Sequence, residues 1–384
     1  MLASHARGRW SDSSAAHIFN FMKKIILSLF ILFIAANIAC AKAIKFKTIK
    51  YIDKQGAGIE CFRMLIPSTW KFTGGIKWVM DNPAMPAVIS FKAYNPSDAE
   101  EMKVFPSEPY FWTNDQTMLM NFPKGSKYMG SVVHPPMSAI NFIKKMLLPK
   151  YWYKVSNLKV VSAMELPELA KALGQKAQSK PGLNAYSDAG KVKINYSKNG
   201  VPIEEEIFVV INRADFSMNG MYGVVTHNNW VCDYIISFKA KKGQLSSNKK
   251  IFDTIVYSFK FNPKWFNKYA QFVNYLVQNQ IKQINNIGEV SKIISRTNDE
   301  ISSGIMESYN QRSKAYDHIS NNFSQHIRGV DEYSDPNKNN PVELPAGYSH
   351  AWSNPLGEYV VSDDPNYNPN VGSNRSWTEM EKNK

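Results

Sequence analysis

The sequence predicts an α+β fold: an antiparallel sheet with helices, followed by a long amphipathic helical segment and a turn-rich C-terminal region. Residues 191–196 alternate polar and apolar side chains and precede Asn199-Gly200, the strongest short signal for a β-hairpin. Residues 248–259 place apolar side chains at helical spacing. Beyond residue 263 this spacing recurs over many turns, and six prolines follow residue 329.

An export signal occupies residues 22–41. It consists of a methionine followed by two lysines, a long apolar run and the small-x-small cleavage sequence Ala-Cys-Ala. The apolar run is shorter than the ~20 residues that a spanning helix needs. Residues 1–21 lack this character, so we expect an over-extended start, with Met22 the true start and Lys42 the first mature residue. An uncleaved N-terminal anchor is the alternative.

The three cysteines permit two modifications. In bacterial lipoproteins a cysteine at the cleavage point carries the lipid, and Cys40 is a candidate because the small residue Ala39 precedes it. Asn37 departs from that pattern, which usually has leucine there. Cleavage after residue 41 leaves Cys61 and Cys232, an even number that permits one disulfide in an exported protein. Two buried free thiols are the alternative.

Charge is distributed unevenly along the chain. The whole sequence has 46 basic and 32 acidic side chains, whereas residues 329–384 have 9 acidic and 4 basic ones. The preceding body is therefore strongly basic and suits an anionic surface or an acidic envelope protein as partner. Scattered solvated lysines are the alternative. Nucleic acid is excluded as a partner, because an exported protein rarely meets it and no recognition motif is present.

The first 200 mature residues alternate between strand and helix patterns. Pro67 and Pro96 each end an apolar run, and residues 227–229 have the composition of a turn. The expected strands are residues 61–66, 87–94, 110–121, 158–164, 191–196, 204–212, 218–226 and 230–239. The expected helices are residues 139–148, 166–176 and 248–259.

One combination of these features is similar to a known family. A strand ending in Pro67-x-x-Trp70, a hairpin sheet and a terminal helix with Ile-Val-Tyr-Ser-Phe at residues 255–259 resemble PsbP-type extrinsic photosystem subunits and their bacterial periplasmic relatives. The resemblance covers about residues 45–262. It implies an α/β/α sandwich for residues 42–262, and a binding or assembly role without catalysis. It assigns no functional residue, because only structural positions match.

Two further regions complete the chain. Residues 263–328 are expected to form one long helix or a helical hairpin, which packs on its own domain or pairs with another chain as a coiled coil. Residues 329–384, rich in proline and aromatic residues, are expected to dock on the body through Trp352 and Trp377. Residues 342–345 and 357–362 are the expected strands of a small hairpin there.

A calcium site is the one metal site for which the sequence offers candidates. Asp363, Asp364, Asn366 and Asn368 place oxygen ligands at close intervals, as calcium loops do. The spacing departs from an EF-hand, because Pro369 replaces the required glycine. A turn stabilised by proline and asparagine is the alternative, and no other cofactor is predicted.

The predicted function follows from export and from the absence of catalytic motifs. We expect a non-enzymatic binding or assembly protein of the bacterial cell envelope, periplasmic or at the cell surface, with membrane contact through a lipid on Cys40 or through the basic body. No catalytic residue is predicted, and the ligand and oligomeric state are open. One alternative is an envelope hydrolase whose site is built from remote residues. Another is a structural subunit of a surface assembly that oligomerises through the long helix.

Overall fold

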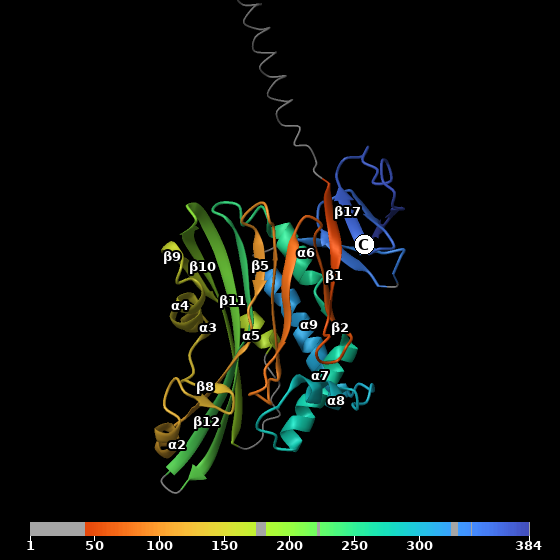
Figure 1. The fold of residues 1–384 in the computed structure, drawn as a ribbon. Coiled ribbons are helices and arrows are strands. Elements are labelled where there is room, and N and C mark those ends of the chain that lie inside the picture. The colour runs from red at the N-terminus through yellow and green to blue at the C-terminus, as the bar shows by residue number, and fades with distance from the viewer. Residues whose placement is uncertain (1–42, 174–181, 221–222, 324–328, 339, 384) are drawn as a thin grey trace, which may run out of the picture.

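The computed structural model describes residues 43–173, 182–220, 223–323, 329–338 and 340–383 (Figure 1). The fold is mostly β, with 43% strand against 23% helix, and it contains several sheets, one of which curves into a half-barrel. The predicted α+β sandwich with a long amphipathic helical segment is therefore wrong. The expected strands were placed correctly in many cases, but they are longer and belong to more sheets than one sandwich holds.

The half-barrel is a ten-stranded sheet. Its main path runs β3 (Lys71–Trp78), β4 (Ala87–Tyr94), β5 (Glu101–Val104), β12 (Gly223–Lys241), β11 (Val201–Gly220), β10 (Leu183–Lys198) and β9 (Ser156–Glu165), all antiparallel. Attached to this path are β6 (Glu108–Thr113), β7 (Lys127–Tyr128) and β8 (Ser131–Val133). The long strands β10, β11 and β12 bend together and form the extended wall seen in Figure 1.

The local sequence explains the turn of the hairpin formed by β10 and β11. For the hairpin formed by β11 and β12, it predicted the turn at the wrong residues. Asn199 and Gly200 have φ angles of 51° and 79°, the conformation of the two-residue turn that joins β10 to β11. The reversal from β11 to β12 falls between Gly220 and Gly223, which pair with each other. Residues 227–229 lie inside β12, because they pair with both β11 and β6. The turn predicted at residues 227–229 is therefore wrong.

Two smaller sheets involve the C-terminal region. The six-stranded sheet runs β13 (Lys260–Phe261), β2 (Glu60–Pro67), β1 (Ile44–Ile52), β17 (Glu358–Ser362), β16 (His350–Ser353) and β18 (Thr378–Glu379). The three-stranded sheet runs β15 (Val342–Pro345), β14 (Val330–Ser334) and β19 (Glu381–Lys382). We call residues 329–383 the tail module. It is ordered and docked, because β17 pairs with β1 (Figure 1). The hairpin expected between residues 342–345 and 357–362 does not form.

The tail module is anchored by different side chains from those predicted. Trp352 and Trp377 pack with Val360 in a small cluster largely internal to the module. The contact with the body is made instead by Phe46 and Leu65, which share a core with apolar residues of β14 to β17. The anchoring is thus a strand pairing backed by an apolar seam.

The helices cover the two faces of the half-barrel. One face carries α3 (Ala139–Phe142), the π-helical turn η1 (Ile143–Leu147) and α4 (Leu148–Tyr151). The other carries α5 (Pro167–Leu173), α6 (Lys249–Tyr257) and α9 (Ser303–Phe323), together with β2. In the chain, α7 (Pro263–Gln278) and α8 (Ile287–Ile294) lie between α6 and α9. The short helix α2 (Gln116–Asn121) lies near one end of β12 (Figure 1).

The region expected as one long helix or hairpin is three helices, α7, α8 and α9. Gly288 and Gly304 are the second residues of α8 and α9. Glycine destabilises a helix interior, so the predicted long helix is interrupted close to these two residues. The apolar stripe nevertheless packs on the chain's own domain, as Trp265, Phe266 and Tyr316 show.

Candidate functional site

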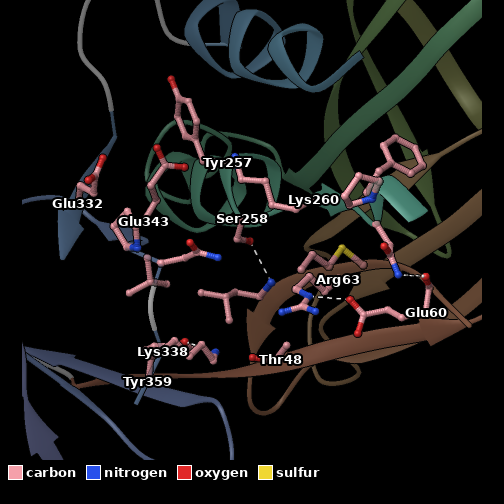
Figure 2. Close-up of a pocket in the computed structure, with 18 of the residues that line it drawn as sticks. Thr48, Glu60, Arg63, Tyr257, Ser258, Lys260, Glu332, Lys338, Glu343 and Tyr359 are labelled. Carbon is pink, nitrogen blue, oxygen red and sulfur yellow. Dashed lines mark hydrogen bonds and ion pairs between the residues drawn. The ribbon is translucent and has the colours of Figure 1, made fainter. Parts of the chain in front are cut away.

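A cleft opens where the body meets the tail module. Its volume is about 670 Å³, within the usual range for sites that bind small molecules. The floor comes from β1, β2 and β13, one side from the end of α6, and the far wall from β14, β15 and the turn between them (Figure 2). The lining residues are Thr48, Glu60, Arg63, Met64, Leu65, Tyr257, Ser258, Lys260, Phe261, Asn262, Pro263, Tyr309, Glu332, Lys338, Asn340, Pro341, Val342, Glu343 and Tyr359.

The sheet beneath the cleft carries a row of cations, of which Arg63 and Lys260 line the cleft. Arg63 on β2 lies directly opposite Lys50 on β1 and Lys260 on β13 in the strand register. Residues directly opposite on neighbouring antiparallel strands point to the same face of the sheet. The three cations therefore form a row across three strands, which we call the basic row. Glu60 accepts a hydrogen bond from Arg63 Nε at 2.6 Å.

A fourth cation enters from the tail module. The Lys338 ammonium donates to the Tyr359 hydroxyl at 2.5 Å. Burial lowers the pKa of Lys338; Asp335 opposes this shift, and the positive charges of Arg63 and Lys50 add to it. Lys338 therefore lies in the electric field of the basic row.

A buried hydrogen-bond network holds this part of the tail module in place. Asp335 is 5% exposed. Its carboxylate accepts from the Tyr359 hydroxyl at 2.8 Å, the Ser353 hydroxyl at 2.8 Å and the Asn337 amide N–H at 2.9 Å. Burial and the hydrogen bond to Asp335 raise the pKa of Tyr359, so its hydroxyl stays protonated and donates. The network fixes the turn that carries Lys338.

The hydroxyl groups of the cleft are already engaged. Ser258 Oγ accepts from the Leu65 amide N–H at 2.9 Å and donates to the Ile255 carbonyl at 3.1 Å. Thr48 Oγ1 donates to the Gly357 carbonyl at 2.5 Å. The partners of both hydroxyls are backbone groups, not the side-chain base that activates a nucleophile. The cleft lining combines charged and apolar side chains.

Cys61 and Cys232 lie on opposite faces of the half-barrel. Cys61 belongs to the core under α6 and α9, and Cys232 to the core under α3 and α4. Both are free thiols and fully buried, and burial raises the pKa of each. The disulfide offered as one alternative does not form in this structure.

The candidate calcium ligands occupy turns of the tail module. Asp363 accepts from the Ser349 amide N–H, Asp364 from that of Asn366, and Asn368 from that of Asn370. These are side chain to backbone bonds of the kind that stabilise turns. Within the described ranges, no group of three or more His, Cys, Asp or Glu side chains is arranged to hold a metal ion.

The lipidation candidate, Cys40, and the predicted signal peptide of residues 22–41 lie outside the described residues. In the part of the chain that the structure describes, no helix combines the length and apolar character needed to cross a membrane.

A second, smaller cavity of about 300 Å³ lies on the half-barrel. Its lining includes Asn212, Arg213 and Asn229. Arg213 is occupied by an ion pair with Asp215 at 2.6 Å and by stacking over Tyr186 at 4.5 Å. Because its one cation is already paired, this cavity offers a ligand less free charge than the cleft does.

The residues that line the cleft were not predicted from the sequence. Lys50 and Arg63 lie on consecutive strands, but Lys260 and Lys338 are far from them in the sequence, and only the strand register brings Lys260 into the row. One local signal existed: Arg63 interrupts the otherwise apolar run of residues 61–66 at a position facing away from the core. A charged side chain at such a position indicates that one face of the strand is uncovered.

Comparisons with known proteins leave the family open. No protein-family model matches this sequence, and no curated protein matches it. Among solved structures, the chain is similar to LpqN, described as involved in cell envelope biogenesis of Mycobacterium tuberculosis. That similarity has 10% identity, covers 57% of this chain and 92% of LpqN, and has a TM-score of 0.21. A score this low carries no argument about fold or function, so the resemblance to PsbP-type proteins remains a prediction.

Proposed function

We propose that this chain is an exported protein of the bacterial cell envelope that works by binding a ligand in the cleft between its body and its tail module. The observation that carries the proposal is the cleft itself: about 670 Å³, with a charged floor and a partly apolar lining. The export signal of residues 22–41 supports the location.

Binding accounts for the cleft better than catalysis does. Several titratable groups converge there, which is the feature expected of an envelope hydrolase. Their arrangement is unlike a hydrolytic site, because Ser258 Oγ is committed to two backbone groups and Arg63 is held by Glu60. The cations that line the cleft, Arg63, Lys260 and Lys338, suit recognition of a negatively charged group.

The structural-subunit alternative is weakened by the helices. Its oligomerisation element was the apolar stripe of residues 263–328, and that stripe is covered by the chain's own core through Phe272, Ala315 and Ile319, none of them exposed. A coiled coil with another chain would have to uncover these side chains.

The proposal is tested by blocking the cleft. Asn340 is exposed and lines the cleft, so Asn340→Trp fills part of it without disturbing a buried contact. The mature protein is incubated with envelope extract and examined by native mass spectrometry. Wild type is expected to gain a bound mass that Asn340→Trp lacks. Asn285→Trp, an exposed position that does not line the cleft, is the matched control and should bind like wild type.

Two results would overturn the proposal. One is an Asn340→Trp protein that keeps the same bound species as wild type. The other is a wild-type protein that gains nothing from any envelope fraction. The export part is tested separately by the intact mass of the protein expressed in a bacterium, which should begin at Lys42 or at a lipid-modified Cys40.

A further inference from the structure

The basic row is an arrangement that a sheet normally avoids. Like charges directly opposite on neighbouring strands are destabilising. Here three cations, Lys50, Arg63 and Lys260, stand opposite one another on three consecutive strands. Arg63 and Lys260 line the open cleft, and Lys50 stands next to Arg63. An arrangement that costs stability at such a place is a candidate for function.

Several lysines elsewhere on the sheets have a carboxylate partner. On the half-barrel, Lys193 pairs with Glu204 at 3.0 Å and Lys239 pairs with Glu101 at 3.0 Å. Lys92, which stands opposite another lysine, also reaches Glu101, at 3.7 Å. These lysines are neutralised by carboxylates on adjacent strands.

The basic row is only partly compensated in this way. Arg63 has Glu60 as its ion-pair partner. Across the described ranges, no carboxylate lies within ion-pair distance of Lys50 or Lys260. Lys338 adds a further cation, and its separation from Asp335 is 3.9 Å. The row therefore keeps positive charge that a ligand can neutralise, and a cleft with walls of low dielectric concentrates that charge's field.

The far wall of the cleft limits what the ligand can be. Glu332 and Glu343 stand opposite each other on β14 and β15, and both line the cleft (Figure 2). Figure 2 shows them on the side away from Arg63 and Lys260. A polyanion that fills the cleft would meet this acidic wall. A ligand with one anionic group and a neutral or cationic remainder avoids the repulsion.

We propose that the basic row, together with Lys338, binds the anionic group of the cleft's ligand, a phosphate or carboxylate carried on a neutral or cationic body. The proposal rests on the proposed function, since it names the chemistry of the same cleft. Guanidinium and ammonium groups side by side suit such an oxyanion, because arginine offers a planar fork and lysine a mobile point charge. Apolar residues of the cleft, among them Phe261 next to Lys260 and Val342 on the far wall, supply contact for the body of the ligand.

The first test uses small probes on the whole mature protein. Phenyl phosphate and benzoate are titrated by calorimetry at low ionic strength, with benzylamine as the cation of matching shape. We expect the two anions to bind and the amine not to. The double variant Arg63→Gln/Lys260→Gln should weaken anion binding at least about tenfold, because a hydrogen bond to a charged group is worth roughly that factor or more.

A matched control removes the same charge elsewhere. Lys71→Gln/Lys198→Gln changes two exposed strand lysines that do not line the cleft, and its affinity should equal that of wild type. Phosphatidylglycerol and phosphatidylcholine vesicles form a separate arm. Binding to phosphatidylglycerol vesicles that is lost in the double variant assigns the anion to a lipid headgroup. Binding of phenyl phosphate without vesicle binding assigns it to a soluble ligand.

A second signature does not depend on the choice of probe. Because the row is repulsive without ligand, Lys260→Gln should raise the melting temperature of the ligand-free protein, whereas Lys71→Gln should not. Sodium phosphate should raise the melting temperature of wild type more than sodium chloride does at equal ionic strength. The inference is wrong if neither anion binds, if the double variant binds as wild type does, or if Lys260→Gln is no more stable.

The two proposals fail in different ways. If Asn340→Trp loses the ligand taken from envelope extract but Arg63→Gln/Lys260→Gln keeps it, the cleft is the site and its ligand is not held by the basic row. If Asn340→Trp also keeps that ligand, the proposed function itself is wrong.

Discussion

Replacing Tyr359 with phenylalanine should release the tail module and displace Lys338 from the cleft. Tyr359 is 1% exposed, and phenylalanine preserves its packing against the seam. What is lost is the hydroxyl, which donates to Asp335 at 2.8 Å and accepts from Lys338. Asp335 keeps two donors, and of the two hydrogen bonds lost the larger contribution is the one to the buried carboxylate, about 2 kcal/mol.

A loss of about 2 kcal/mol raises the population of the open tail module roughly 30-fold. Limited proteolysis measures this directly, since cleavage tracks the open population when opening is fast relative to cleavage. Tyr367→Phe is the matched control, because Tyr367 belongs to the same module, packs on Trp352, and has no hydroxyl hydrogen bond among the described residues. If Tyr359→Phe is cleaved after residue 329 no faster than Tyr367→Phe, the network does not hold the module.

Three further outcomes are expected. Burial raises the pKa of Tyr333 to about 12 and that of Tyr359 further, whereas an unfolded tyrosine ionises near pH ~10. Stability against urea should therefore be unaffected by these groups below about pH 10 and fall above it, by about 1.4 kcal/mol per pH unit for each such tyrosine; a flat profile to pH 11 would contradict this. Phe46→Ala should cost about 3–5 kcal/mol in calorimetry and free the tail module to protease, because Phe46 is fully buried in the seam. Cys61 and Cys232 should resist alkylation in the native protein and both react after denaturation without reductant, whereas two unreactive thiols would indicate a disulfide.

Local signals in the sequence predicted individual elements well. The turn at Asn199-Gly200 and the helix from Lys249 to Tyr257 are set by residues close together in the chain, and both were placed correctly. The turn predicted at residues 227–229 failed for a physical reason. Those polar residues are paired on both sides, by β11 and β6, and β6 lies more than 100 residues earlier. Tertiary pairing overrode the local preference for a turn.

Sheet order and the cleft were out of reach for the same reason. The six-stranded sheet joins β1 to β17, so its register depends on residues about 300 positions apart. Of the strands in that sheet, the sequence patterns predicted only residues 61–66 and 357–362, and the first strand, β1, was not predicted. No local pattern predicts that Lys50 lies opposite Arg63 in the sheet, or that Lys260 lies opposite Arg63 on its other side. The tail module's docking was predicted from its aromatic content, but the anchoring residues were not, because Trp352 packs mainly within the module.

One face of β1 and β2 explains why docking and binding occur side by side. Phe46 and Leu65 lie at one end of this face and are covered by the tail module. Lys50 and Arg63 lie at the other end of the same face, in the same register, and stay uncovered. The apolar end drives docking of the tail module. Covering the basic end with apolar residues would bury unpaired charges, which costs free energy. The tail module therefore covers only the apolar end of this face, and the cleft lies over the uncovered basic end. Variants that undock the module should thus lose the ligand even with the basic row intact, whereas variants of the row should lose it with the module still docked.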